Sequence, residues 1–318
     1  MSTRRKRIMA SDSGHLLPAD IEASIQAIRD DREHGASWLA RAAAGVLLRL
    51  TEPRDAISAD TWDAMVKTAA QALVAARPSM AAVANTAARI WAAGQLATPA
   101  DAREPLRDMA KRLATQDEQT QQSLLAHAEK LFHGSVYTMS RSGAVEDVLR
   151  DLGQRRIIER VLIGASMPGG EGVAMGRALA QSGLDVTLIA DAACGLFIGE
   201  ATCVVLGADS LRADGSLVNK VGSYPLALVA REAGKPVYVL CETLKIAARD
   251  FPLVLEEMDP AELLPDPVAG YHARNPYFDV TPAALLAGNV TEKGVLDRTA
   301  IARYAKAAGA ALARLHAG

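Results

Sequence analysis

The stretch from Val204 to Tyr224, VVLGADSLRADGSLVNKVGSY, constrains the fold more than any other part of this chain. Its apolar, β-branched start is typical of a strand buried on both faces of a parallel sheet, and the strand should end at Gly207 and Ala208. Asp209 then follows the carboxyl end of that strand. Open α/β sheets bind their ligands at this edge, so Asp209 is a candidate site residue.

Two further polar residues of the same stretch, Asn219 and Lys220, are predicted to lie in a loop before an apolar, helix-like run. They offer amide donors and a cation, and we expect them to share a crevice with Asp209. That combination suits a polyol carrying phosphate, because the carboxylate handles hydroxyls or a proton while the lysine neutralises charge. The alternative is that Asp209 caps a turn and Lys220 is a solvated surface residue.

The sequence pattern differs between the N-terminal and C-terminal parts of the chain. From Pro18 to about Lys130 the apolar residues recur at helical spacing in an alanine-rich background, which predicts an all-α domain. After Gly134, short β-rich runs alternate with helical ones, which indicates βαβ units. We therefore predict an α/β protein whose C-terminal Rossmann-like parallel sheet domain (126–318) follows an all-α N-terminal domain (18–125). Residues 1–17 are expected to form a flexible N-terminus.

Composition excludes several classes of function. The 318 residues carry a net charge of −2 and only 4% aromatic residues, which argues against nucleic-acid binding and against an anionic membrane surface. No apolar run approaches the roughly 18 residues that a spanning helix needs. Cys194, Cys203 and Cys241 have no metal-ligand spacing, and we expect reduced thiols in a cytoplasmic protein without metal or cofactor.

The segment GADSLRADGSLVNKVGSY resembles the signature of the initiation factor 2B alpha/beta/delta subunit family, which includes ribose-1,5-bisphosphate isomerase and methylthioribose-1-phosphate isomerase. Four more stretches resemble the same family in the same order, and with the first they span most of the chain from Arg32 onward. They are REHGASW (32–38), TMSRS (138–142), ETLK (242–245), and YFDVTP with TEKG (277–282 and 291–294). The resemblance implies a sugar-phosphate pocket and a homodimer or larger homo-oligomer.

The resemblance at residues 32–38 implies that a helix start approaches the phosphate of the ligand through His34, Gly35 and Ala36. Relatives carry Arg-Gly-Ala there, and in this chain His34 replaces the arginine while Arg32 lies two residues away. Histidine is only partly charged at neutral pH and cannot form the bidentate arginine fork. A plain helix boundary without a ligand is the alternative.

A predicted strand at 135–138 leads into Ser140, Arg141 and Ser142 before a helix, a plausible phosphate cradle. The alternative is a pair of serine caps with a surface arginine. In the isomerases this strand ends in Thr-His-Cys-Asn, and the resemblance implies a catalytic cysteine beside the aspartate that matches Asp209. Ser140 occupies the cysteine position, and a serine hydroxyl has too high a pKa to replace a thiol. The family's isomerase mechanism is therefore disfavoured, and Cys194 is a candidate substitute for the missing thiol.

Two further turns, one rich in glycine and one at Asp191, lie between these motifs. The glycine-rich turn at 164–176 invites a dinucleotide interpretation but lacks a clean GxGxxG. The family has Glu-Ser-Arg-Pro here, and this chain keeps Ser166 and Pro168 but has Met167 for the arginine. The resemblance also implies that Asp191, in a turn like the family's Asp-Ser-Ala, lines the pocket.

The C-terminal motifs add a second cation and an interface. The resemblance of Glu242-Thr-Leu-Lys245 to the family's Glu-Thr-x-Lys implies that Lys245 contacts the ligand, so a short sugar with a phosphate at each end would use both lysines. A salt-bridged surface lysine is the alternative. Thr281 is predicted to cap a helix beginning at Pro282. The alanine-rich helix 299–315 is expected to pack against a partner subunit.

Three functions follow. The first is a protein that holds a phosphorylated or nucleotide-linked sugar in the crevice of Asp209, Asn219, Lys220 and Lys245 without thiol-dependent turnover. The second is an aldose-ketose isomerase acting on ribose 1,5-bisphosphate or a relative, with Asp209 as acid or base. The third is a regulatory subunit like those of the translation factor.

Overall fold

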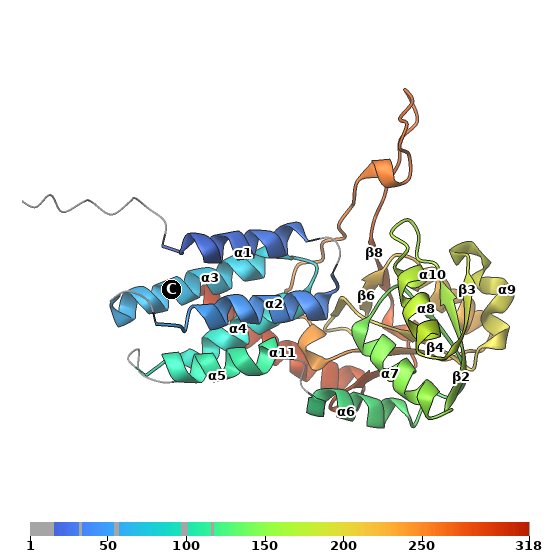
Figure 1. Ribbon diagram of the computed structural model, residues 1–318, viewed down its shortest axis with the longest axis horizontal. Coiled ribbons are helices and arrows are strands. Elements are labelled where there is room, and N and C mark those ends of the chain that lie inside the picture. Colours follow the sequence, from blue (N-terminus) through green and yellow to red (C-terminus); the bar gives the residue numbers. More distant parts are fainter. Residues whose placement is uncertain (1–15, 32–33, 54–56, 97–100, 116–117, 318) are drawn as a thin grey trace, which may run out of the picture.

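The computed structural model describes residues 16–31, 34–53, 57–96, 101–115 and 118–317 (Figure 1). Almost all of the predicted flexible N-terminus and Arg32 lie outside these residues. The described chain forms a helical half and an α/β half that lie side by side, and the predicted fold class is confirmed. No described helix combines the length and apolar character needed to cross a membrane.

The helical half is built around one central helix. Its helices are α1 (Ala19–Asp30), α2 (Ala36–Arg49), α3 (Ala59–Ala76), α4 (Ala81–Gly94) and α5 (Arg103–Ala114). Helix α4 contacts α2, α3 and α5, and nearly all of its residues are buried. Alanine dominates its surface, so the neighbouring helices can pack closely around it, and Asn85 on α4 contacts the other half through its side-chain amide.

The main sheet of the α/β half has the strand order β10-β9-β7-β4-β1-β2-β3 and is parallel except for the β9–β10 pair. The strands are β1 (Gly134–Met139), β2 (Ile158–Gly164), β3 (Asp185–Ile189), β4 (Cys203–Leu206), β7 (Val237–Leu240), β9 (Gly288–Thr291) and β10 (Gly294–Leu296). Because the parallel strands all end at one edge, the loops after β1, β2, β4 and β7 meet there.

Helices cover both faces of this sheet. Along β4, Val204 and Leu206 face one core while Cys203 and Val205 face the other, as the two-residue period of a strand requires. One face packs against α10 (Ser223–Glu232), and the other packs against α7 (Gly143–Gln154) and α8 (Glu171–Gln181). Helix α6 (Glu118–Ala128) also lies on the α7 side, where it contacts β9.

A small antiparallel sheet, in the order β5-β6-β8, joins the two halves. It contains β5 (Ser210–Leu211), β6 (Leu217–Lys220) and β8 (Phe278–Thr281). Asn219 and Lys220 therefore lie on a strand, not in the predicted loop. Asp209 is fixed just before this sheet, because its backbone N–H donates to the carbonyl of Val218 at 3.0 Å.

The predicted cap at Thr281 is wrong. Thr281 is the last residue of β8, and its buried hydroxyl has no hydrogen-bond partner among the described residues. The segment that follows is a single 3₁₀ turn, Ala283–Leu285, whose N-cap residue is Pro282. The proline was correctly placed at a helical start, but the turn is too short to need a side-chain cap.

The last helix, α11 (Arg298–His316), contacts both halves of its own chain. Ile301 and Ala305 pack into the core beneath the main sheet, whereas Ala311 and Leu315 join the core of the helical half. Figure 1 shows this red helix running from the α/β half into the helical half. Its apolar face is thus buried within the chain, and packing of its other faces against a partner subunit stays a prediction.

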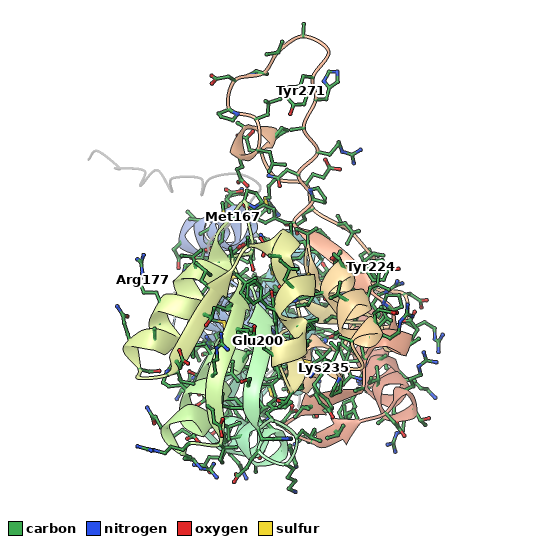
Figure 2. All side chains as sticks on the ribbon, turned by 90° about the vertical axis from the view of Figure 1, so that its right-hand side faces the viewer. Met167, Arg177, Glu200, Tyr224, Lys235 and Tyr271 are labelled. Carbon is green, nitrogen blue, oxygen red and sulfur yellow. The ribbon has the colours of Figure 1, made fainter. Side chains whose placement is uncertain are left out.

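A long segment between β7 and β8 projects from the body of the molecule, with Tyr271 near its tip (Figures 1 and 2). Its regular elements are two 3₁₀ turns, Thr243–Lys245 near β7 and Pro260–Glu262 further along. The base of this segment is held against the helical half. The Glu256 carboxylate forms an ion pair with Arg77 and accepts a hydrogen bond from the Ser79 hydroxyl.

Candidate functional site

A cavity of about 1330 Å³ lies where the helical half meets the carboxyl edge of the main sheet. All ten candidate residues line it: His34, Gly35, Ala36, Ser140, Arg141, Ser142, Asp209, Asn219, Lys220 and Lys245. They come from α2, the turn after β1, the turn after β4, strand β6 and the turn after β7. The fold therefore brings five distant parts of the sequence to one place, and their chemistry depends on how each side chain is held.

Asp209 and Lys245 lie close enough in the cavity for the charge of one to act on the other. Burial raises the pKa of the Asp209 carboxyl, and the opposing effects come from Lys245 first, then Arg77 and Lys220. Lys245 is 5% exposed, and its ammonium donates to the carbonyl of Ala208 at 2.6 Å. A carboxyl that retains its proton more readily than usual can exchange a proton with a hydroxyl or carbonyl of a sugar.

The turn that carries Lys245, Thr243–Lys245, is positioned by the helical half. Asn85 of α4 donates through its side-chain amide to the carbonyls of Leu244 and Ile246, at 2.7 and 2.8 Å. Asn85 is 2% exposed, so these bonds satisfy a buried amide and are expensive to lose. The position of Lys245 therefore depends on the contact between the two halves.

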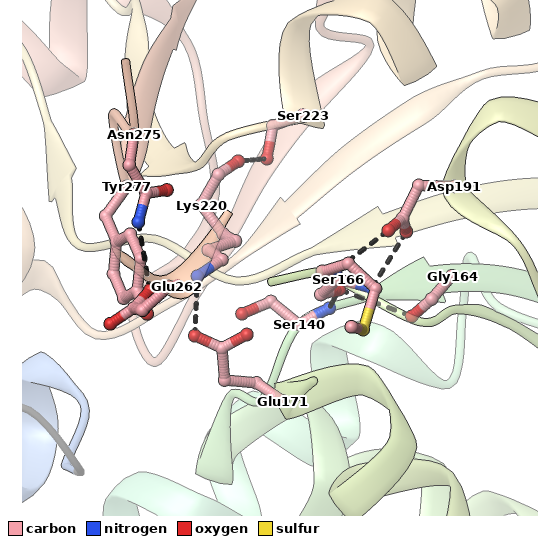
Figure 3. Close-up of polar contacts among 11 residues, drawn as sticks. Ser140, Gly164, Ser166, Glu171, Asp191, Lys220, Ser223, Glu262, Asn275 and Tyr277 are labelled. Atoms are coloured by element: carbon pink, nitrogen blue, oxygen red, sulfur yellow. Dashed lines mark hydrogen bonds and ion pairs between the residues drawn. The ribbon is translucent and has the colours of Figure 1, made fainter. Parts of the chain in front are cut away.

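Lys220 is already paired within the cavity (Figure 3). Its ammonium lies 2.6 Å from a carboxylate oxygen of Glu171 and 3.5 Å from the centre of the Tyr277 ring. Its side chain is 4% exposed, against 31% for Glu171. Asn219 is engaged as well, because its amide donates to the hydroxyl of Ser223 at 2.9 Å. An anionic ligand would have to compete with Glu171 for Lys220.

Ser140 is held by a relay of hydrogen bonds that begins at Asp191 (Figure 3). The two Asp191 oxygens accept the backbone N–H groups of Ser166 and Met167, both at 2.8 Å. The Ser166 hydroxyl then accepts the backbone N–H of Ser140 at 2.7 Å. Ser140 and Ser166 both adopt positive φ, 58° and 61°, a strained conformation for residues other than glycine. This relay fixes the turn after β1.

Asp191 and Met167 do not themselves line the cavity. The expectation that Asp191 contacts the ligand is therefore corrected: it acts through Ser166, which is 1% exposed and lies behind the turn. Met167, at the position of the family's arginine, is 59% exposed and lies on the outer surface (Figure 2).

Three helices begin at the cavity wall, and none has a side-chain cap. Their N-cap residues are Gly35 for α2, Ser142 for α7 and Gly170 for α8. The Ser142 hydroxyl is buried and has no hydrogen-bond partner among the described residues. Helix N-termini present N–H groups and a partial positive charge, so this wall suits an anion. Arg141 adds a cation, 56% exposed and 3.2 Å from Glu146.

His34 lies at the open rim of the cavity. Its ring nitrogen Nδ1 lies 2.8 Å from the Asp31 carboxylate, and the ring stacks on Trp38 with centroids 3.7 Å apart. The imidazole is therefore held by its own helix region. Gly35 has no atom within 4 Å of where a β-carbon would stand, so the backbone before α2 is accessible from the cavity.

None of the three cysteines lines the cavity. Cys203 and Cys241 are core residues, 2% and 0% exposed, and burial raises the pKa of Cys203 to about 11 and that of Cys241 to about 12. Cys194 is the first residue of the short helix α9 (Cys194–Phe197) and packs against the core on the α10 side of the sheet. The structure thus offers no substitute thiol next to Asp209. No cluster of metal ligands occurs among the described residues.

The sequence analysis missed several cavity residues of the helical half, among them the arginines Arg41, Arg77, Arg89 and Arg112. Arg77 is 3% exposed, donates to the carbonyl of Asp31 at 2.7 Å, and pairs with Glu256 at 3.5 Å. Arg89 lies on α4 and also lines the cavity. Arginines in alanine-rich helices look like a solvated face, and their sequence spacing contains no signal that separates them from surface residues.

The cavity is polar, lies between a helical half and the carboxyl edge of a parallel sheet, and has three helix N-termini in its wall. These features define a class of two-part α/β proteins with a small-molecule pocket. Residues 32–298 match the sequence model described as the initiation factor 2 subunit family, and the chain belongs to that family. The recognition based on the five motifs is thereby confirmed.

Relatives in this family have different named activities. A ribose 1,5-bisphosphate isomerase of Archaeoglobus fulgidus is 30% identical over 87% of this chain and 90% of its own length. A methylthioribose-1-phosphate isomerase of Syntrophotalea carbinolica is 30% identical over 92% of each chain. Among solved structures, the translation initiation factor eIF-2B of Pyrococcus horikoshii superposes with a TM-score of 0.74 at 28% identity, covering 88% of this chain and 97% of its own. Family membership alone therefore does not identify the activity of this protein.

Proposed function

We propose that this protein binds a phosphorylated or nucleotide-linked sugar in the cavity and does not use the thiol-dependent isomerase mechanism. The observation that carries the proposal is the set of groups that line the cavity. Three uncapped helix N-termini and Arg141 suit a phosphate, while the Asp209–Lys245 pair and Asn219 suit hydroxyl groups. The volume of about 1330 Å³ accommodates either class of ligand.

The absence of a thiol supports the second part of the proposal. Ser140 occupies the end of β1, and all three cysteines of the chain lie outside the cavity. A serine hydroxyl at this position can donate a hydrogen bond to a sugar oxygen, but it does not ionise near neutral pH. Binding can therefore persist where thiol catalysis is lost.

Asp209 favours one second candidate, an aldose-ketose isomerase that uses a different acid or base. A desolvated carboxyl with a raised pKa is the group that such proton transfer needs, and it would be costly to bury in a purely structural role. Two relatives of this chain are named as isomerases of sugar phosphates. In this alternative Asp209 moves the proton between the two carbon atoms, and Lys245 stabilises the charge that develops on oxygen.

Calorimetric titration with ribose 1,5-bisphosphate, ribose 5-phosphate and a nucleotide sugar tests binding, and NMR of the same mixtures detects any ketose. We expect saturable binding of at least one ligand without ketose formation. Turnover that disappears in Asp209→Asn would replace the binding proposal with the isomerase. Absence of binding by all three ligands would reject both.

A further inference from the structure

Arg89 is a cavity residue for which neither the fold nor the proposed ligand contacts described above provide a use. It lies one helical turn beyond Asn85 on α4, at the part of the cavity formed by Thr243, Glu292 and Tyr304. Asn85 anchors the neighbouring turn through Leu244 and Ile246, so this region of α4 is firmly placed against the α/β half.

The guanidinium of Arg89 is desolvated and has no partner. Burial lowers its pKa, against the attraction of Glu292 and Tyr304. Within the described part of the chain it makes no hydrogen bond or ion pair. The nearby Glu292 carboxylate is occupied, because it accepts the backbone N–H of Thr243 at 2.9 Å and the Thr243 hydroxyl. A half-buried cation without a counter-ion is unfavourable unless a ligand supplies the anion.

Arg89 and Asp209 lie in different electrostatic neighbourhoods of the same cavity. The charges that act on Asp209 belong to Lys245, Arg77, Lys220 and Glu256, whereas those that act on Arg89 belong to Glu292 and Tyr304. Arg89 also comes from α4 of the helical half, whereas Lys220 and Lys245 come from β6 and from the turn after β7. The cavity therefore has a second cationic group, separate from the group around Asp209.

Resting on the proposed function, we propose that Arg89 is a specificity-determining residue that binds the second phosphate of a sugar with a phosphate at each end. The uncapped N-termini of α7 and α8, with Arg141, hold one phosphate. Asp209 and Lys245 then face the hydroxyl groups of the sugar, and the Arg89 fork pairs with the other phosphate. This assignment differs from the expectation that Lys220 and Lys245 hold the two phosphates, since both lysines already have partners.

The test compares ribose 1,5-bisphosphate with ribose 5-phosphate by calorimetric titration of the wild type, Arg89→Met and Arg231→Met. Arg231 is an exposed arginine of α10 outside the cavity, so its substitution is the matched control for the loss of one charge. We expect Arg89→Met to weaken bisphosphate binding at least tenfold while monophosphate binding changes less than threefold. Arg231→Met should leave both affinities unchanged, and Arg89→Lys should recover part of the loss.

Thermal unfolding of the free proteins separates ligand binding from a structural role. We expect the melting temperature of Arg89→Met without ligand to equal or exceed that of the wild type, because the substitution removes a half-buried charge without a counter-ion. If the wild type binds the bisphosphate and Arg89→Met binds it with the same affinity, the proposed role of Arg89 is wrong. The proposed function is not affected by that result. Equal weakening of both ligands with a lower melting temperature also overturns the role of Arg89. A wild type that binds neither ligand overturns the proposed function and this inference together.

Discussion

The two halves of the molecule place their cavity residues by different means. In the α/β half, backbone N–H groups of the turns are held by carboxylates behind them: Asp191 holds Ser166 and Met167, and Asp279 of β8 accepts N–H groups of Gly222 and Tyr224 at 2.8 and 3.1 Å. In the helical half, long side chains reach across the junction, as Arg77 does to Glu256.

The two sets of cavity residues therefore depend on different parts of the structure. A turn held by a carboxylate keeps its shape as long as the sheet is intact, because its partners are main-chain groups of the same edge. A side chain that bridges two halves is positioned only when the halves are docked. Substitutions at the bridge should therefore disturb the whole assembly, whereas substitutions behind a turn should act locally.

The largest effect is expected from Arg77→Met. Removing the guanidinium leaves Glu256, 17% exposed, without its cation and leaves the carbonyl of Asp31 without this donor. Breaking a buried ion pair in this way costs about 3 to 5 kcal/mol of unfolding free energy. Urea unfolding measures the loss, with the exposed Arg231→Met as control, for which we expect less than about 0.5 kcal/mol. Equal stability of the two variants would break the proposed distinction between the halves.

Asp279 gives the α/β half a pH dependence of its own. Burial raises its pKa to about 6 in the folded protein, above the roughly 3.9 of an unfolded chain. Between these values the folded state binds more protons, so stability falls as pH rises from about 4 to about 6. The stabilising contribution is thus fully present below pH 4 and lost through pH 6, with an upper limit of about 3 kcal/mol.

Urea titrations from pH 4 to 7 test this contribution by comparing the wild type with Asp279→Asn. The substituted residue cannot titrate, so we expect its unfolding free energy to fall less with rising pH over that interval. Identical slopes for the two proteins would show that Asp279 ionises in the fold as it does in the unfolded chain.

A smaller and more local effect is expected from Asp191→Asn. An asparagine retains one acceptor oxygen and places an amide donor against the N–H of Ser166 or Met167, which costs about 2 kcal/mol. The loosened turn also carries Ser140, so ligand affinity should fall as well. Asp185→Asn, at an exposed position on β3, is the matched control and should leave stability and affinity unchanged. If Asp191→Asn behaves like this control, the relay to Ser140 has no mechanical role.

Most of the α/β half could be predicted from its sequence. β-Branched runs such as Val204–Leu206 predict buried strands, and parallel topology then brings Asp209, Ser140 and Lys245 to one edge. The small sheet was missed because β5 contains only Ser210–Leu211 and its polar surroundings resemble a turn. Strands this short are stabilised by pairing partners from distant segments, here β8, which local pattern does not reveal.

The helical half was predicted as a set of helices, but its contribution to the cavity was not. The spacing of apolar residues determines which face of α4 is buried, yet it does not say that Asn85 and Arg89 point toward the α/β half. The same holds for Lys220, whose pairing with Glu171 brings together residues from β6 and α8.

The sequence alone therefore determined the fold class, the family and the residues that reach the sheet edge, because periodicity and strand-end geometry are properties of local segments. The tertiary structure was needed to show that Lys220 and Lys245 already have partners, and that the cavity residue Arg89 makes no hydrogen bond or ion pair within the described residues. Pairing of charges depends on distances of a few ångströms between segments far apart in the chain, and those distances exist only after the two halves have packed.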